Sequence, residues 1–285
     1  MKLCRFRLDQ EIARVGMSHD EQRVFDITSL CGGVLASLLE SEQSEQLITE
    51  YLAKNPGSYQ VSEVRFLSPL DRQEVWAAGV TYLRSKKARM EESNFSASAY
   101  DRVYEAERPE LFFKSLPEKV VAHAESVGIR RDSRWNVPEP ELALVFNSRA
   151  RLVGCTICND MSSRDIEGEN LLYLPQAKIY DRSCAAGPWI RINAPEQEIR
   201  SWDIRLSVQR KNEVVYLGET SVGQIKRTFS ELGAFLFRSQ KFPHGVALST
   251  GTGIIPPDDF TLRVGDWIRI EIPGIGVLEN SVAEV

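Results

Sequence analysis

Two glutamates stand at alternate positions at the start of an apolar segment. They are Glu139 and Glu141, in the stretch PEPELALVF, which runs from Pro138 to Phe146. In a β-strand, side chains alternate between the two faces, so both carboxylates would share one face, about 6.5 Å apart along the chain. The apolar residues that follow on this face direct it towards an interior, where neighbouring unpaired carboxylates are costly and repel one another. These two carboxylates therefore need compensation.

A third carboxylate follows in the segment CNDMSSRD. Asp160 stands at the end of the next apolar segment, and antiparallel pairing of the two segments would bring it beside the glutamates. Three converging carboxylates without histidine or cysteine form an all-oxygen site of the kind that Mg²⁺, Mn²⁺ or Ca²⁺ occupies. The alternative, which the spacing fits equally well, is that the glutamates face solvent or pair with Arg164, Arg131 or Lys178.

Strands must position these carboxylates. The segments ELFFKS, PEPELALVF and RLVGCTICND are typical of strands, and a tight turn at NSRA joins the last two. Further strands are expected in VWAAGVTY, WDIRLSVQR, EVVYLGET, DWIRIEI and GVLENSV, and a helix in FSELGAFLFRSQ. Because strands outnumber helices and no βαβαβ order is present, the sequence predicts a β-rich α+β fold.

The first part of the chain differs in character from the rest. Its segments LCRFRL, RVFDITSL and EVRFLSPL are expected to be strands and GVLASLLES a helix, before a boundary that contains proline. We therefore expect a small N-terminal α+β domain over residues 1–68 and a larger domain over residues 69–285. Two charged helical segments between Ser85 and Glu107 are expected to form either a cover over a site or a surface hairpin.

Composition limits the class of partner. The 285 residues are 42% hydrophobic and 26% charged, which is typical of a globular protein, and the net charge is −5 with an isoelectric point near 5.5. This acidic balance argues against nucleic acid or an anionic membrane as partner and favours a small molecule. The N-terminal segment lacks the apolar core of a signal peptide and no apolar run is long enough to span a membrane, so we expect the cytoplasm.

Five cysteines without a regular framework fit a reducing compartment. Two of them, Cys155 and Cys158, form the motif CTIC, but a spacing of three on a strand sends their side chains to opposite faces. A redox pair requires a helix N-terminus, and a zinc site requires further cysteine or histidine ligands. Both thiols are therefore expected to be buried and structural.

Several segments together resemble a known family. PEPELALVF, NDMSSRD, LPQAKIYDRSCAAGPW and STGTGI, in that order, resemble the fumarylacetoacetate hydrolase family, and the resemblance runs from about Trp76 to the C-terminus. It implies that the larger domain is a catalytic mixed β-roll and that a divalent metal is held by Glu139, Glu141 and Asp160. Mg²⁺ is the expected ion, with Mn²⁺ or Ca²⁺ as alternatives. Members are commonly dimers or tetramers, so a homo-oligomer is expected.

One subgroup of this family is especially similar. The segments RPELFFKS, PEPELAL and GENLLYLPQAKIY look most like lyases that dehydrate 2-keto-3-deoxy sugar acids. In addition, Ser85 stands where hydrolases of the family often carry a histidine that activates water, and we expect Ser85 to contact substrate. The histidines of the chain are His19, His123 and His244; His123 either reaches the site from another strand or is structural.

The resemblance also implies substrate-binding residues. Lys178, which by default would be a surface lysine, is expected to be catalytic and substrate-binding, as a cation that stabilises developing oxyanion charge. Thr250, Gly251 and Thr252 could simply form a bend. By resemblance, their backbone N–H groups and hydroxyls hold the carboxylate of the substrate.

Glu110 opens the apolar strand ELFFKS. This environment suits a general acid or base, although an ion pair with Arg108 fits the sequence equally well.

These features predict a Mg²⁺-dependent dehydratase that acts on a 2-keto-3-deoxy sugar acid through an enolate chelated by the metal. In this hypothesis Glu110 removes a C3 proton and Lys178 stabilises the enolate. The alternative is a C–C bond hydrolase of the fumarylacetoacetate or acylpyruvate type, or an oxo-acid decarboxylase, on the same metal. A metal-stabilised scaffold is a further hypothesis, but such a protein would need neither Lys178 nor the TGT loop.

Overall fold

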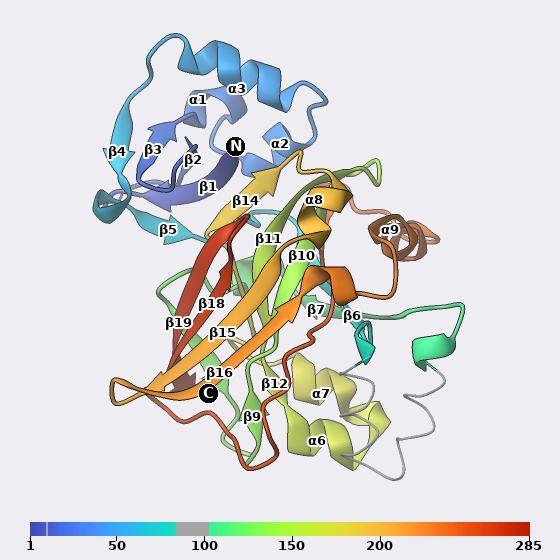
Figure 1. Cartoon of the computed structure of the whole chain (residues 1–285). Coiled ribbons are helices and arrows are strands. Elements are labelled where there is room, and N and C mark those ends of the chain that lie inside the picture. The colour runs from blue at the N-terminus through green and yellow to red at the C-terminus, as the bar shows by residue number, and fades with distance from the viewer. Residues whose placement is uncertain (10, 84–102) are drawn as a thin grey trace.

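The N-terminal part of the protein combines short strands with three short helices. The computed structural model describes residues 1–9, 11–83 and 103–285, and the N-terminal part is blue in Figure 1. The segment RVFDITSL changes from strand to helix at its middle, because Asp26 accepts hydrogen bonds from both the amide and the hydroxyl of Thr28. The elements are β1 (Lys2–Arg7), β2 (Arg14–Ser18), β3 (Arg23–Asp26), α1 (Thr28–Cys31), α2 (Leu35–Leu39), α3 (Ser44–Leu52), β4 (Ser58–Gln60) and β5 (Arg65–Leu67).

The remaining part of the chain is rich in strands. These are β6 (Glu74–Gly79), β7 (Glu110–Ser115), β8 (Ser126–Ile129), β9 (Asn136–Val137), β10 (Pro140–Phe146), β11 (Leu152–Asp160), β12 (Ser162–Ser163), β13 (Cys184–Ala186), β14 (Trp189–Ile192), β15 (Asp203–Arg210), β16 (Glu213–Ser221), β17 (Val246–Ser249), β18 (Trp267–Ile272) and β19 (Gly276–Glu284). The α-helices are α6 (Arg164–Glu169), α7 (Leu174–Lys178), α8 (Glu196–Arg200) and α9 (Phe229–Phe237), and 3₁₀ turns lie at Val61–Glu63, Pro117–Lys119, Leu171–Tyr173 and Val222–Gln224. The predicted β-rich α+β fold is confirmed.

Two sheets dominate the architecture. The larger has the strand order β4-β3-β2-β1-β14-β11-β10-β17-β6-β7, with β5 paired to β1 and β13 to β11. The smaller has the order β16-β15-β18-β19-β8, and β9 and β12 form a separate pair. Most neighbours are antiparallel, but β17 runs parallel to β6 and β19 runs parallel to β8. The predicted pairing of PEPELALVF with RLVGCTICND is present as the antiparallel pair β10 and β11.

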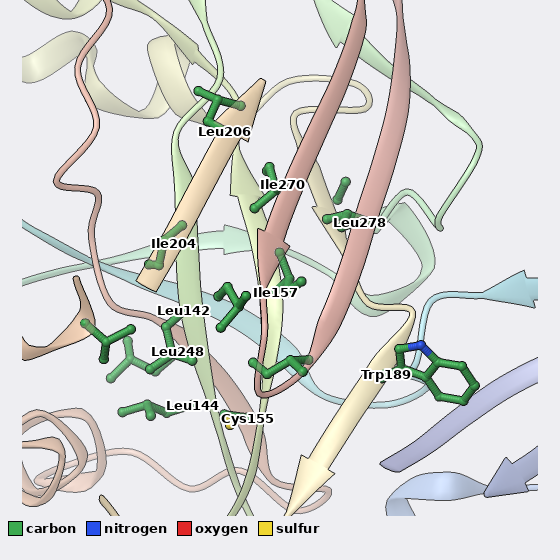
Figure 2. Close-up of a cluster of buried hydrophobic side chains, with 14 of the residues drawn as sticks. Leu142, Leu144, Cys155, Ile157, Trp189, Ile204, Leu206, Leu248, Ile270 and Leu278 are labelled. Atoms are coloured by element: carbon green, nitrogen blue, oxygen red, sulfur yellow. The ribbon is translucent and has the colours of Figure 1, made fainter. Parts of the chain in front are cut away.

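The core explains why the central strands lack a polar face. Side chains from one face of β10 and β11, among them Leu142, Leu144 and Ile157, pack against the smaller sheet at Leu206 and Ile270, as Figure 2 shows. The other face of β10 packs in a second cluster that includes residues of the N-terminal helices. Every residue of β10 is therefore buried, whereas β18 alternates between buried and half-buried positions because its outer face meets solvent.

The larger sheet continues across the predicted domain boundary. Strand β1 pairs with β14, with Leu3 opposite Ile190, so backbone hydrogen bonds join the first residues to the middle of the chain. A division into residues 1–68 and 69–285 stays a prediction. Among the described residues, no helix has the length and apolar character needed to cross a membrane.

Candidate metal and substrate site

Three buried carboxylates converge where β10 begins and β11 ends. Glu139 directly precedes β10, Glu141 lies within it, and Asp160 closes β11. The backbone amide of Asp160 donates to the carbonyl of Glu139 at 2.9 Å, which brings the ends of the two strands together. One oxygen from each carboxylate lies within 4.8 Å of the others, and the three residues are at most 3% exposed. The predicted convergence is therefore present.

Three buried cations surround this carboxylate trio, as we call Glu139, Glu141 and Asp160. The ammonium of Lys178 lies 2.7 Å from Glu139 Oε2 and 3.1 Å from Asp160 Oδ2, and the Arg164 guanidinium lies 2.8 Å from Glu139 Oε1. The sequence offered ion pairs of the glutamates with Arg164 or Lys178 as an alternative to converging carboxylates. The structure contains both the ion pairs and the convergence.

Lys114 was not singled out from the sequence. Its ammonium contacts Asp160 and donates to the carbonyl oxygens of Met161 and Lys178. Arg131, which the sequence also offered as a partner for the glutamates, instead donates to the carbonyl of Val285 at 3.2 Å.

Among the described residues, hydrogen-bond donors rather than a cation hold Glu141. The Ser249 hydroxyl and the Gly251 amide donate to Glu141 Oε2 at 2.5 and 2.7 Å. Burial raises the pKa of the Glu141 carboxyl well above its usual range, and the nearby carboxylates of Asp160 and Glu139 raise this pKa further. A divalent cation between the three groups would oppose both effects, because it favours the charged carboxylates.

The donor set around the trio fits a hard divalent ion. Within the described residues, five carboxylates border the cavity at the trio, and three cations lie against these carboxylates. If all eight groups are ionised, the site has two more negative than positive charges. Its volume of about 20 Å³ admits one water-sized occupant. Oxygen ligands at these spacings match the preference of Mg²⁺. The carboxylates are Glu110, Glu139, Glu141, Asp160 and Glu167, and the cations are Lys114, Arg164 and Lys178.

Two short helices line one side of the cavity, and Figure 1 shows them at the end of the molecule away from α1, α2 and α3. Arg164 and Glu167 are three residues apart on α6, and Leu174 and Lys178 are four apart on α7. Residues at these spacings share a helix face, so each helix presents two side chains to the cavity. Sequence reasoning missed Glu167: its spacing from Arg164 is a signal, but a helix of six residues is too short for that signal to be reliable.

Glu110 reaches the cavity because its neighbour has no side chain. Glu110 begins β7 opposite Gly79 on β6, and both line the cavity. A Cβ atom on Gly79 would lie 2.1 Å from Glu110 Oε2 and 2.6 Å from its Cδ. The Arg108 guanidinium lies over the ring of Phe235, 5.6 Å from its centre, and within the described part of the chain no ion pair joins Arg108 to Glu110.

Replacing Gly79 by alanine is expected to displace the Glu110 carboxyl group while the fold survives, because a flexible side chain can move aside. A displacement of about 1 Å at a catalytic group lowers kcat by roughly 10²-fold. Steady-state kinetics and a thermal melt measure both effects. The matched control is Gly57→Ala, since a Cβ atom there meets nothing within 4 Å. Equal kcat values for Gly79→Ala and Gly57→Ala would contradict the expected catalytic role of Glu110.

The three residues of the TGT loop, Thr250, Gly251 and Thr252, have different positions relative to the cavity. Gly251 and Thr252 line the cavity, but the Gly251 amide is engaged by Glu141. Gly251 also has a φ of +84°, and a Cβ atom would lie 2.3 Å from Thr81 Oγ1, so this position requires glycine. The Thr250 hydroxyl donates to the Leu142 carbonyl at 2.8 Å, within the loop packing. Substrate binding by these three residues stays a prediction.

Ser85 and His123 are the two remaining candidates for the site. Ser85 and the greater part of the expected helical cover fall within residues 84–102, outside the described residues. His123 lies away from the trio: its ring meets Phe66 edge-on, and its Nδ1 accepts from the Glu279 amide at 3.2 Å. Burial lowers the pKa of His123, which favours the neutral, structural histidine.

Cys155 and Cys158 lie on opposite faces of β11, as predicted. Cys155 packs in the cluster between the sheets, and Cys158 packs in the second cluster, with its sulfur 3.9 Å from that of Cys184. All five cysteines are free thiols. Burial raises the pKa of Cys155 to about 12, as expected of an unreactive thiol.

Separate replacement of Cys155 and Cys158 by alanine should cost stability but leave turnover intact. Each change removes a buried sulfur, at a cost of roughly 1 kcal/mol. Denaturant unfolding and kinetics with and without peroxide test this expectation. A peroxide-dependent, reductant-reversible loss of activity that disappears in either variant would show that the thiols have a redox role.

Several known proteins are similar to this chain in sequence. Residues 74–283 match the family model described as fumarylacetoacetate (FAA) hydrolase C-terminal. A probable 2-keto-3-deoxyxylonate dehydratase of Haloferax volcanii is 44% identical over 217 residues, which cover 76% of this chain and 74% of that protein. A 2-dehydro-3-deoxy-D-arabinonate dehydratase of Saccharolobus solfataricus is 39% identical over 228 residues, covering 79% and 76%.

A solved structure extends the likeness to the whole chain. It is a 2-keto-3-deoxy-D-arabinonate dehydratase complexed with magnesium and 2,5-dioxopentanoate, with a TM-score of 0.82 and 31% identity. The match covers 100% of this chain and 99% of that one.

Proposed function

The chain belongs to the fumarylacetoacetate (FAA) hydrolase family, and on that premise we propose that it is a Mg²⁺-dependent dehydratase of a 2-keto-3-deoxy sugar acid. The observation that carries the proposal is the buried trio of Glu139, Glu141 and Asp160, whose oxygens converge within 4.8 Å. The names of the relatives support a sugar acid, and the magnesium bound in the solved structure supports the ion.

The trio would hold the metal. When bound, Mg²⁺ supplies Lewis acidity at the carbonyl of a 2-oxo acid, which makes the hydrogens on C3 more acidic. Mn²⁺ and Ca²⁺ are alternatives, because they also prefer oxygen ligands. Gly251 orients Glu141 through its amide, and Ser162 orients Lys178 by a 2.5 Å hydrogen bond.

Other residues of the chain would bind the substrate and move protons. The Lys178 ammonium lies at the trio, where it can stabilise the negative charge that develops on the C2 oxygen. Glu110 is the proposed base for the C3 proton, because its carboxyl group borders the same cavity from the strand pair β6 and β7. Thr252 and Ser85 are proposed to contact the substrate, Thr252 from the cavity wall.

A comparison of substrates tests this function. Protein loaded with Mg²⁺ is incubated with 2-keto-3-deoxypentonates, 2-keto-3-deoxyhexonates and acylpyruvates, and kcat/KM is measured for each. We expect turnover of a keto-deoxy acid and its loss on chelation. Turnover of acylpyruvates alone would assign the protein to the C–C bond hydrolases, and release of CO₂ from an oxo acid would make it a decarboxylase. A lower melting temperature on chelation, without turnover of any compound, would indicate a scaffold.

We propose further that the protein works in the cytoplasm as a dimer or tetramer. Its five free thiols support a reducing compartment, and the family resemblance supports the oligomer. Sedimentation velocity measures the oligomeric state directly.

A further inference from the structure

Two adjoining cavities share part of their wall. The inner cavity lies at the carboxylate trio, and an outer cavity of about 330 Å³ lies beside it. Glu110, Glu167 and Leu174 line both cavities, and we call the region between these three residues the passage. A substrate with its 2-oxo acid group at the trio would therefore extend its remaining carbons past Glu110 and Glu167.

Glu167 is built into this passage. It is 3% exposed and lies on α6, three residues after Arg164, whose guanidinium is fixed on Glu139. One helical turn advances about 5.4 Å, so Glu167 stands on the same helix face as Arg164 but about one turn further along. Glu110 lines the same two cavities from a different element, strand β7. Two carboxyl groups thus flank the path of the substrate.

The proposed reaction needs more than one proton-transfer group. Loss of the C3 hydrogen and the C4 hydroxyl from a 2-keto-3-deoxypentonate gives 5-hydroxy-2-oxopent-3-enoate. To become a 2,5-dioxo acid, this enone must lose a proton from C5 and regain one at C3. C5 is the carbon furthest from the 2-oxo acid group, so this transfer calls for a second carboxyl group that borders the outer cavity as well as the trio, as Glu167 does.

We propose that Glu167 is a second acid–base residue, which protonates the leaving C4 hydroxyl and then removes the C5 proton; this inference rests on the proposed function. In the first step, the Glu110 carboxylate takes the C3 proton, the C3–C4 double bond forms, and the C4–O bond breaks as Glu167 in its acid form converts the hydroxyl to water.

The second step restores both groups. The Glu167 carboxylate takes a proton from C5, the C4–C5 double bond forms, and Glu110 returns its proton to C3, where the C3–C4 double bond is lost. The resulting C4–C5 enol takes a proton at C4 from water and gives its hydroxyl proton back to water, which yields the aldehyde. Each carboxyl group ends in the protonation state in which it began.

The test uses Glu167→Gln and, as matched control, Glu169→Gln, since Glu169 is an exposed glutamate on the same helix. The synthetic enone 5-hydroxy-2-oxopent-3-enoate is supplied directly, and its conversion to 2,5-dioxopentanoate is followed by NMR. We expect Glu167→Gln to slow this conversion by roughly 10²- to 10⁴-fold, with Glu169→Gln equal to the unmodified protein.

Two further readouts separate catalysis from structure. In Glu167→Gln, Mg²⁺ affinity by calorimetry and exchange of the C3 hydrogens with D₂O should persist, because both depend on the trio and Glu110. If this variant does not fold, Glu167→Asp replaces it, with a smaller slowing expected because a carboxyl group remains.

Three results would overturn the inference. Conversion of the enone by Glu167→Gln at the unmodified rate removes Glu167 from the chemistry. If Glu167→Gln loses Mg²⁺ affinity and C3 exchange as well as conversion of the enone, Glu167 has a structural role. Absence of turnover of every 2-keto-3-deoxy sugar acid, pentonates and hexonates alike, by the unmodified protein overturns the proposed function, and the inference with it.

Discussion

Replacing Glu141 by glutamine will abolish Mg²⁺ binding and turnover together while the protein stays folded. The amide oxygen still accepts from the Ser249 hydroxyl and the Gly251 amide, but it no longer offers a charged ligand to the ion. Since a bound metal is worth several kcal/mol of transition-state stabilisation, we expect kcat/KM to fall by more than roughly three orders of magnitude. Calorimetric titration with Mg²⁺ measures the binding.

The control is a buried carboxylate that belongs neither to the trio nor to the cavity beside it. Asp266 is 1% exposed and pairs with Arg210 at 2.8 Å, so Asp266→Asn should cost stability without changing Mg²⁺ affinity. Asparagine at Asp160 is also preferable to alanine, because Lys114 and Lys178 both contact this carboxylate and alanine would leave them without it. Unchanged Mg²⁺ affinity in both Glu141→Gln and Asp160→Asn would exclude the trio as the metal site.

Glu110→Gln is expected to slow dehydration by roughly two to four orders of magnitude and to abolish C3 exchange in D₂O. The amide fills the same space over Gly79 but cannot accept the proton, so Mg²⁺ affinity should not change. NMR of the C3 signal in D₂O follows exchange, and calorimetry follows Mg²⁺ binding. Exchange at the unmodified rate would show that another group removes the C3 proton.

The trio could be predicted because its physical cause is local. Alternation places Glu139 and Glu141 on one face of a strand, and a short turn makes β10 and β11 antiparallel neighbours, which carries Asp160 to them. The opposite orientation of Cys155 and Cys158 follows from the same two-residue period. Both predictions needed only the spacing within one hairpin.

The positions of the cations around the trio and of the residues that line the passage depend on packing between segments far apart in the sequence. Lys114 follows two phenylalanines in β7 and meets the carbonyl of Met161, 47 residues away, because of where β7 lies relative to the end of β11. Arg164 and Glu167 lie on a helix of six residues, too short for a reliable periodic pattern. The pairing of β1 with β14 joins residues far apart in the sequence and gives no local signal.

The fate of the carbon chain tests the proposed dehydration most directly. A 2-keto-3-deoxypentonate labelled uniformly with ¹³C is incubated with the Mg²⁺-loaded protein, and the products are separated and weighed by mass spectrometry. Dehydration breaks a C–O bond and predicts one labelled 2,5-dioxo acid that retains all the carbons of the substrate. Labelled pyruvate with a shorter labelled fragment, or rapid cleavage of acylpyruvates with no turnover of the keto-deoxy acid, would contradict it.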